Sequence, residues 1–332
     1  MKVIRLHARA DLRLHNEPDP IPGSGEKMVQ VKAVGICGSD LHWFIEGGIG
    51  DAQLLEHPLV PGHEFAGILD SGERVAVDPA IPCGKCDFCK HGHPNLCPEI
   101  RFAGYGNVDG ALCEYMAWDE RCLFPLPDSI TDEEGAMLEP LGVAIHAVDL
   151  AHLKTGMTVG VFGCGPIGLL IIQLAKLSGA VKIIATDKLP HRVEAAKTLG
   201  ADHAHFVSDR LDSSTLRAAT GGRGVDVAFE VAGNQGAVDD AFAAVIPGGK
   251  VILTGIPDDE KTSFSASVAR RKGLTIKLVR RMKHTYPRAI ELVAQGLVDV
   301  RSLVTHRFPL AQADGAFSMA ERREGLKVIV EC

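Results

Sequence analysis

The sequence lacks the features that mark several specialised classes of protein. It has no run of Lys or Arg and a formal net charge of −7, so nucleic acid and anionic membranes are not expected as partners. Charges interrupt every apolar stretch of the N-terminus, MKVIRLHARADLRLH, and no signal peptide is predicted. The most apolar stretch, 159–177, is broken by glycines and a proline and is short for a membrane span, which needs about 20 apolar residues.

What remains is the composition of an ordinary globular protein. The chain has 332 residues, enough for about two domains, with 46% hydrophobic and 23% charged residues. It contains nine cysteines, an odd number, and without a secretion signal these are expected as reduced thiols in a cytoplasmic protein. Four of them, Cys113, Cys122, Cys164 and Cys332, are expected as thiols buried in the core.

The chain changes character near residue 131. Before it, alternation at 27–34 and 73–80 between Gly- and Pro-rich turns predicts a β-rich domain. A Thr N-cap candidate and acids in the first turn then predict one helix over 131–151. Strands and helices alternate after it, which predicts a parallel, doubly wound sheet in an α/β protein. The expected strands cover 158–163, 182–187, 203–207, 224–233, 249–256 and 274–279, and the expected helices cover 166–179, 190–200, 213–220 and 235–246.

The last segment, 284–332, breaks this alternation. Its pattern predicts two amphipathic helices and a strand over 327–331. We expect it to return to the first domain.

A glycine-rich loop predicts a dinucleotide site. GCGPIG follows an expected strand and opens an expected helix, with Asp187 at the end of the next strand. Gly163 permits the tight turn, Gly165 lets the backbone approach the pyrophosphate, and Gly168 lets helix and strand pack closely. Asp187 is expected to accept hydrogen bonds from the adenosine ribose, which favours NAD over NADP. The other expected cofactor contacts are Pro166, Ile167, Lys188, Arg192, Val231, Gly255, Ile256 and Arg281.

Four cysteines lie within one short segment, PCGKCDFCKHGHPNLC. The spacing of Cys83, Cys86, Cys89 and Cys97 allows four thiolates to converge on one zinc, and such a site leaves no position open for substrate. The segment has little apolar surface, so a metal would supply its order. A structural zinc is therefore predicted. An iron–sulfur cluster is the alternative, although no second cysteine set accompanies this one.

A second set of candidate ligands is scattered. A thiolate, an imidazole and a carboxylate could form an open, catalytic zinc site, although spacing alone does not establish one. The candidates are Cys37, Ser39, Asp40 and His42 in GICGSDLH, His63 and Glu64 in PGHEFAG, and Glu139 and His146 in LEPLGVAIHA. Trp43 and Phe44 either wall a substrate pocket or pack in the core.

These motifs, in this order, resemble the zinc-dependent medium-chain dehydrogenases over essentially the whole chain. EPLGVAIHA and TYPRAIELVAQG make the sequence most similar to the sorbitol (polyol) dehydrogenase branch, with threonine and butanediol dehydrogenases close by. The resemblance implies a GroES-like domain over 1–140 and 284–332 that carries both zincs. It also implies a Rossmann domain over 141–283 that binds NAD.

The family's functional residues carry over to named positions. Cys37 and His63 match zinc ligands, and Glu139 lies where the alcohol dehydrogenase branch has its second cysteine ligand. In the polyol branch Glu64 can itself be a ligand, so either glutamate could bind directly. Ser39 matches the hydroxyl of a proton relay, and His42 matches a residue near its end.

The resemblance implies reversible oxidation of a secondary alcohol to a ketone, with hydride passing to NAD and a proton leaving through the relay. It leaves a polyol, a sugar, a vicinal diol and a β-hydroxy amino acid open as substrates. Met282 follows Arg281 where sorbitol dehydrogenases have Arg-Tyr, so sorbitol itself is not implied. A homodimer or homotetramer is expected. Two rival functions are a zinc-free quinone or enoyl reductase and an NAD(H)-binding sensor without turnover.

Overall fold

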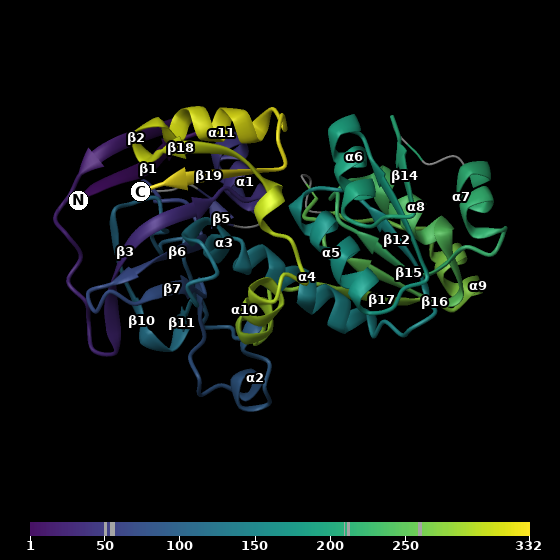
Figure 1. The fold of residues 1–332 in the computed structure, drawn as a ribbon, viewed down its shortest axis with the longest axis horizontal. Helices are drawn as coiled ribbons and strands as arrows, with labels where there is room; N and C mark the ends of the chain where they lie inside the picture. Colours follow the sequence, from purple (N-terminus) through teal and green to yellow (C-terminus); the bar gives the residue numbers. More distant parts are fainter. Residues whose placement is uncertain (50–51, 54–56, 209, 211–212, 258–260) are drawn as a thin grey trace. The chain divides into compact units, whose positions relative to one another are not determined.

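The computed structural model describes residues 1–49, 52–53, 57–208, 210, 213–257 and 261–332. The chain divides into two units (Figure 1). Unit 1 comprises Met1–Gly142 and Lys283–Cys332, and unit 2 comprises Val143–Met282. Unit 1 is therefore built from both ends of the chain, whereas unit 2 is one continuous segment.

A seven-stranded sheet forms the centre of unit 1. In spatial order its strands are β11 (Leu123–Pro125), β7 (Arg74–Val77), β6 (Glu64–Leu69), β3 (Glu26–Gly35), β19 (Lys327–Glu331) and β18 (Val304–Pro309), with β10 (Tyr115–Asp119) also paired to β3. Strand β3 pairs antiparallel with both β6 and β19, so the last strand of the chain lies next to one of the first. This pairing brings residues from the two ends of the sequence to one face of the sheet.

Shorter elements surround this sheet. They are the antiparallel strand pairs β1 (Lys2–Ala8)–β2 (Asp11–Asn16), β4 (Gly48–Ile49)–β5 (Ala52–Gln53) and β8 (Ala80–Ile81)–β9 (Arg101–Phe102), the helices α1 (Gly38–Glu46), α2 (Asp87–Lys90), α10 (Tyr286–Ala294) and α11 (Ala313–Glu321), and the 3₁₀ turns η1 (Pro94–Leu96), η2 (Glu120–Cys122), η3 (Arg301–Leu303) and η4 (Leu310–Gln312). Trp43 and Phe44 of α1 are both buried in the core of unit 1, where Phe44 contacts Phe317. The structure thus favours core packing for this aromatic pair.

The single helix expected over 131–151 is two helices, α3 (Asp132–Ala136) and α4 (Leu138–Ala151). Thr131 caps α3, since its side chain accepts a hydrogen bond from the Glu134 N–H. Proline 140 explains the break, because it has no N–H to donate to the Ala136 carbonyl four residues earlier. The interruption places Glu139 in the first turn of a new helix.

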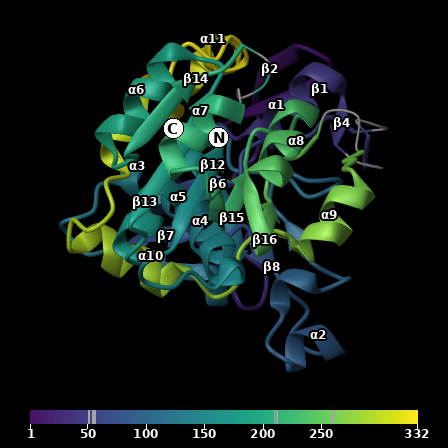
Figure 2. The ribbon, with the colours of Figure 1, turned by 90° about the vertical axis from the view of Figure 1, so that its right-hand side faces the viewer.

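Unit 2 contains a parallel sheet with helices on both faces (Figure 2). Its spatial order is β14 (His203–Phe206), β13 (Lys182–Asp187), β12 (Thr158–Phe162), β15 (Val225–Glu230), β16 (Val245–Leu253) and β17 (Thr275–Leu278). This is the 3-2-1-4-5-6 order of doubly wound dinucleotide-binding sheets, and the predicted α/β fold class is confirmed. The helices are α5 (Pro166–Leu177), α6 (Pro190–Thr198), α7 (Ser213–Thr220), α8 (Gln235–Ala244) and α9 (Ala266–Lys272).

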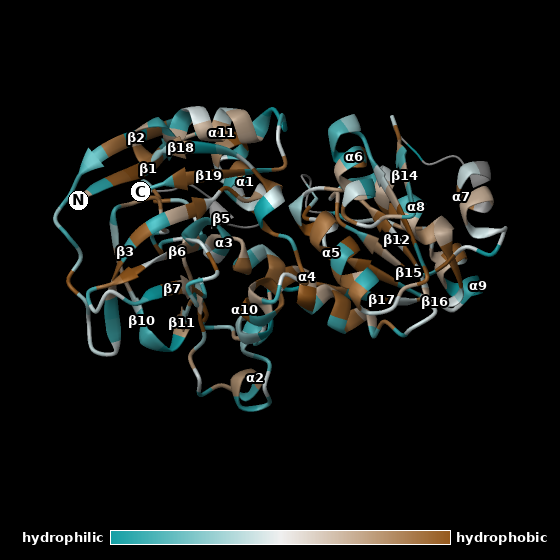
Figure 3. Ribbon diagram, viewed as in Figure 1, coloured by the Kyte–Doolittle hydropathy of each residue, from teal (hydrophilic) through white to brown (hydrophobic). Residues whose placement is uncertain are grey.

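Apolar residues dominate the centre of this sheet. Strand β12 and helix α5 are brown in Figure 3, and seven residues of α5 are buried. A strand covered by helices on both faces has no solvent side, so its sequence is apolar at nearly every position rather than alternating.

Two further expectations differ from the structure. The helix expected over 235–246 ends at Ala244, because Val245 and Ile246 begin β16. Strand β18 was not expected, since its sequence VTHRFP contains no apolar run. Within the residues that the structure describes, no helix has both the length and the apolar character of a membrane span.

Candidate active site and metal centres

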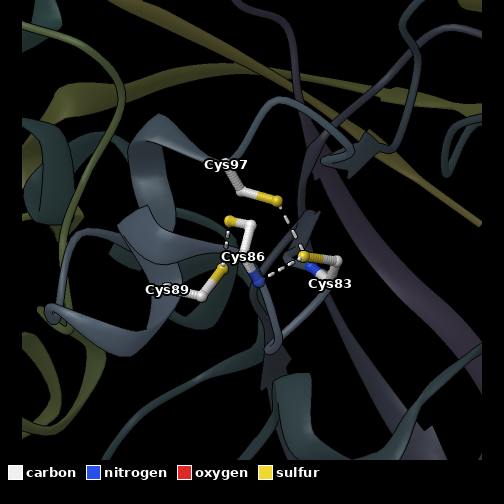
Figure 4. Close-up of side chains that lie close together, drawn as sticks. All are labelled: Cys83, Cys86, Cys89 and Cys97. Atoms are coloured by element: carbon white, nitrogen blue, oxygen red, sulfur yellow. Dashed lines mark hydrogen bonds between the residues drawn. The ribbon is translucent and has the colours of Figure 1, made fainter.

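The four clustered cysteines converge on one point (Figure 4). Their sulfur atoms all lie within 4.8 Å of one another. Backbone N–H groups already point at these sulfurs: the N–H of Cys86 lies 3.3 Å from the sulfur of Cys83, and the N–H of Cys83 lies 3.4 Å from that of Cys97. Hydrogen bonds from the N–H groups of Lys85 and Cys86 lower the pKa of Cys83 to about 7. Four converging sulfurs with N–H support suit a tetrahedral zinc.

The segment that carries these cysteines, here called the lobe (Cys83–Cys97), has little other support. Helix α2 has four residues and none of them is buried. Figures 1 and 2 show α2 projecting away from the sheet of unit 1. A segment with so little buried apolar surface would gain its order from a metal held by these sulfurs.

A second group of ligand atoms is buried in the body of unit 1. One ligand atom each of Cys37, His63 and Glu64 lies within 4.8 Å of the other two. Cys37 is the N-cap of α1, His63 precedes β6, and Glu64 is the first residue of that strand. His63 and Glu64 are 5% and 1% exposed, respectively. Sulfur, nitrogen and carboxylate oxygen are the ligands of catalytic zinc, and three protein ligands leave a position for substrate.

Asp40 ties the two ligand-bearing segments together. Its buried carboxylate accepts hydrogen bonds from the N–H of Cys37 at 2.9 Å and the N–H of Gly62 at 3.1 Å. The same carboxylate lies 3.4 Å from Nδ1 of His63. Burial acts to lower the pKa of His63, but the charges of Asp40 and Cys37 outweigh it, so this pKa lies well above its ordinary value. The contact at Nδ1 fixes the ring and turns Nε2 away from Asp40, where a metal would take the place of its proton.

Glu64 has a buried cationic partner, Lys327 of β19. The two side chains form an ion pair and are 1% and 3% exposed. Gly35 of β3 is paired with Glu64 of β6. A Cβ on Gly35 would overlap the Glu64 carboxylate and would lie 2.9 Å from Cε of Lys327. The glycine therefore makes room for the pair, and Lys327 offsets part of the negative charge of the ligand group.

Glu139 lies outside the group of three ligand atoms that meet within 4.8 Å. It is 5% exposed, and burial raises the pKa of its carboxyl to about 8, against the opposing charges of His63 and Lys327. It also feels the negative charge of Glu64. Of the two glutamates considered as ligands, Glu64 is the one that the fold brings to Cys37 and His63.

The two expected relay residues occupy one side of α1. The hydroxyl oxygen of Ser39 lies 3.4 Å from Nε2 of His63, the nitrogen turned away from Asp40. His42 follows three residues later, a spacing that places it on the same face of the helix. Its Nδ1 contacts the Glu46 carboxylate at 3.2 Å. Ser39 is thus beside the ligand group, and His42 is one helical turn farther along.

The glycine loop of unit 2 fits a dinucleotide. Gly163 has φ +111°, and a Cβ there would come within 2.8 Å of the Ala232 nitrogen. A Cβ on Gly168 would overlap the Gly163 carbonyl, so helix α5 can pack here only with glycine. Gly165 is the N-cap of α5, and Pro166 and Ile167 form its first turn. The free N–H groups of such a helix start are suited to a pyrophosphate.

Asp187 lies at the end of β13 and is 9% exposed. Its carboxylate accepts hydrogen bonds from the N–H of Cys164 at 2.7 Å and the N–H of Leu189 at 2.8 Å. These bonds hold the carboxylate beside the glycine loop and leave each oxygen able to accept another hydrogen bond. The guanidinium group of Arg192 lies near the glycine loop, 3.6 Å from where a Cβ on Gly165 would be. The side chain of Lys188 is exposed.

The other expected cofactor residues lie on neighbouring segments of unit 2. The Val231 N–H donates to the Phe162 carbonyl at the end of β12. Gly255 and Ile256 follow β16, and Ile256 is 51% exposed. Arg281 follows β17 and has a positive φ of 54°. Val231, Gly255 and Ile256 therefore surround the carboxyl ends of β12, β15 and β16.

Two residues beside the buried ligand group, Asp40 and Lys327, have no role in the sequence predictions. The sequence signal for Asp40 is an acid three residues after Cys37, a candidate ligand. The sequence signal for Lys327 is a lone charge at the start of the apolar run VIV. The four remaining cysteines are free, and Cys113, Cys122 and Cys164 are buried while Cys332 is partly exposed.

Comparison with known proteins agrees with this geometry. Residues 23–128 match the alcohol dehydrogenase GroES-like domain, and residues 166–295 match the zinc-binding dehydrogenase family. Sorbitol dehydrogenase of Bacillus subtilis (strain 168) is 38% identical over 99% of this chain and 97% of its own.

Solved structures give the same result. Alcohol dehydrogenase rspB of Escherichia coli CFT073, complexed with NADH, superposes with a TM-score of 0.91 at 29% identity, covering 100% of this chain and 99% of that one. The 2R,3R-butanediol dehydrogenase of Bacillus subtilis superposes with a TM-score of 0.87 at 31% identity, with the same coverage. The chain therefore belongs to the zinc-dependent medium-chain alcohol and polyol dehydrogenases, oxidoreductases that use zinc and a nicotinamide coenzyme.

Proposed function

We propose that this enzyme oxidises a secondary hydroxyl of a polyol or vicinal diol to a ketone and transfers the hydride to NAD. The observation that carries the proposal is the buried group of Cys37, His63 and Glu64, with the Ser39 hydroxyl beside it. The similarity to sorbitol dehydrogenase over nearly the whole chain supports a polyol substrate. Bound zinc would polarise the substrate hydroxyl and lower its pKa, and NAD would accept the hydride.

The chain's own residues would prepare the site and move the proton. Cys37, His63 and Glu64 would hold the metal, with Asp40 fixing the His63 ring and Lys327 balancing the charge of Glu64. The Ser39 hydroxyl is well placed to accept the substrate proton and pass it on toward His42. Serine is too weak a base to keep that proton, so it would act as a link in a chain.

Glu139 would serve as a reserve ligand in this proposal. Its carboxyl is buried close enough to the group to sense His63 and Glu64, yet it lies outside the three that meet. In the lobe, Cys83, Cys86, Cys89 and Cys97 would hold a structural zinc.

The test is a screen of the zinc-loaded protein with NAD over polyols, sugars, threonine and butanediol. NADH formation is followed by absorbance, and the Cys37→Ala variant supplies the background. A clear preference for polyols or butanediol over sugars and threonine supports the proposal. No turnover of any alcohol by protein that holds both zincs would instead favour a coenzyme-binding sensor.

Within this substrate class, a vicinal diol such as butanediol is the alternative to a longer polyol. The close superposition with 2R,3R-butanediol dehydrogenase favours it, and so does the absence of the Arg-Tyr pair at Arg281–Met282. The ratio of kcat/KM for sorbitol and 2,3-butanediol decides between the two candidates.

The preference for NAD rests on Asp187, whose negative charge would repel a 2′-phosphate.

We further propose a homodimer or homotetramer in the cytoplasm. Strand β17 is an edge of the unit 2 sheet and Leu278 on it is 74% exposed, so a second copy could pair there. Nine free thiols suit a reducing compartment. Light scattering of the purified protein tests the assembly.

A further inference from the structure

Unit 2 has a buried carboxylate besides Asp187 near the proposed coenzyme site, and it lies far in the sequence from both groups of candidate metal ligands. Glu230 is the last residue of β15 and is 2% exposed. One of its oxygens, Oε1, accepts hydrogen bonds from the N–H of Ala232 at 2.8 Å and the N–H of Gly233 at 2.7 Å. The carboxylate therefore folds the chain after β15 back over the end of its own strand.

The same residue also reaches the neighbouring strand. Its backbone carbonyl accepts hydrogen bonds from the N–H of Thr254 at 2.8 Å and the N–H of Gly255 at 3.2 Å. Its second carboxylate oxygen, Oε2, lies 2.8 Å from where a Cβ on Gly255 would be. Glu230 thus contacts two loops, 231–234 after β15 and 254–256 after β16.

These two loops meet so closely that only glycine fits between them. A Cβ on Gly255 would come within 2.6 Å of the Gly233 Cα, and a Cβ on Gly233 would overlap the Ile256 carbonyl. The first loop also touches the glycine-rich loop, since a Cβ on Gly163 would lie 2.9 Å from the Ala232 Cβ. A small shift of loop 231–234 would therefore disturb both of its neighbours.

The sheet order indicates which half of the coenzyme these loops face. A dinucleotide lies across the switch point of a doubly wound sheet, with one mononucleotide over each half. Asp187 marks the adenosine half, at the end of β13. Strands β15 and β16 lie on the other side of β12, so the loops after them belong to the nicotinamide half.

We propose that Glu230 is a positioning residue for the nicotinamide half of the coenzyme, because its carboxylate fixes loops 231–234 and 254–256 against each other. The inference rests on the proposed coenzyme site. Burial raises the pKa of the Glu230 carboxyl, and the N–H groups of Gly233 and Ala232 act to lower it. These N–H groups take the place of a cation for this buried acid.

The experiment compares whole coenzyme with its adenosine half. Dissociation constants for NADH and for AMP are measured by fluorescence and calorimetry on the zinc-loaded full chain and on the Glu230→Gln and Glu230→Asp variants. Glutamine keeps the size of the side chain but can turn an amide donor toward Gly255, whereas aspartate withdraws the carboxylate from both loops. We expect NADH binding to weaken about tenfold, which corresponds to about 1.4 kcal/mol, and AMP binding to change less than about twofold.

Asp240→Asn is the matched control. Asp240 is another buried carboxylate of unit 2. It lies on helix α8, is 5% exposed and forms an ion pair with Arg210. This variant loses a buried charge without touching the two loops, and its NADH-to-AMP affinity ratio should equal that of the wild type. Asp187→Ala should instead weaken AMP and NADH together, because both ligands contain the adenosine ribose.

The outcomes separate the inference from the function on which it rests. Equal weakening of NADH and AMP in the Glu230 variants, or no weakening of NADH, overturns the inference alone. Wild-type protein that binds neither NADH nor NADPH overturns the proposed coenzyme site and the inference with it. Should Glu230→Gln fail to fold, the Glu230→Asp variant decides by the same ratio; if both fail while Asp240→Asn folds, Glu230 is a stability residue and the proposal is wrong.

Discussion

The four cysteines of the lobe come from one stretch of fifteen residues, whereas Cys37, His63 and Glu64 come from α1, the turn before β6 and β6 itself. The lobe has almost no buried support beyond its sulfurs. The buried group is surrounded by Asp40, Lys327 and the backbone of three strands. The two groups of candidate metal ligands thus stand in opposite relations to the protein around them. In the lobe the metal would hold the protein, and in the buried group the protein would hold the metal.

The largest effect should come from the buried group. Cys37→Ala removes one of the three converging ligands, and turnover should fall about ten-thousandfold, since a Lewis-acid metal contributes several kcal/mol to catalysis. The fold and NADH binding should remain, because unit 2 is untouched. Metal analysis should show one zinc per chain less than in the wild type. Cys113→Ala, at a buried thiol outside both groups, serves as control, and full activity of Cys37→Ala would exclude this site.

Removing one cysteine of the lobe should lower the stability of the protein more than it lowers turnover. Cys89→Ala should lower the free energy of unfolding by about 4 kcal/mol, because the lobe has little else to order it. Thermal unfolding measures the loss, and the folded fraction should keep most of its activity per bound zinc. Cys122→Ala, at a buried thiol of η2, is the control. A lobe variant that loses turnover while its melting temperature stays unchanged would reverse the roles assigned to the two groups.

Lys327→Met tests the claim that the protein prepares the buried group before metal binds. Without zinc the variant leaves Glu64 with no buried cation, and the free energy of unfolding should fall by about 3 kcal/mol. With zinc the loss should be much smaller, because the metal supplies the positive charge. Melting temperatures of zinc-loaded and chelated samples are compared with those of Lys32→Met, a half-exposed lysine of β3. An equal loss in both metal states contradicts this role.

The smallest of these effects concerns a site that needs no metal. Asp187→Ala should weaken NADH binding about tenfold, because the adenosine ribose loses a hydrogen-bond acceptor. It should also narrow the difference between the affinities for NADH and NADPH, because no carboxylate then repels the 2′-phosphate. Zinc content should stay at the wild-type value. Titration with both coenzymes measures the change, and an unaltered preference would show that Asp187 does not set it.

The contrast between the two centres also explains what the sequence could predict. The lobe is local, so the spacing of its cysteines identifies all four candidate ligands without further information. The glycine loop and Asp187 are nearly as local, since a strand, a turn and a helix carry the whole signal. The doubly wound sheet was predicted from alternating strands and helices, and its strand order follows from the rule for such sheets.

The buried group could not be predicted in the same way. Its ligands came only from resemblance, and spacing left Glu64 and Glu139 as alternatives. The structure separates them through pairing across strands: Gly35 in β3 pairs with Glu64 on one side and with Ile329 in β19 on the other. Lys327 reaches the group by this route from near the end of the chain, a contact that no local pattern contains. Pro140 shows the opposite case, since the break between α3 and α4 follows from a purely local property, the missing N–H of proline.

Strand β19 enters the sheet between β3 and β18, and it carries the cation that Glu64 needs. During synthesis this strand is made only after every residue of unit 2. The continuous segment Val143–Met282 can therefore fold before unit 1 has all of its strands. Until β19 is made, the carboxylate of Glu64 lacks its lysine, and an ion captured early would take the place of that charge.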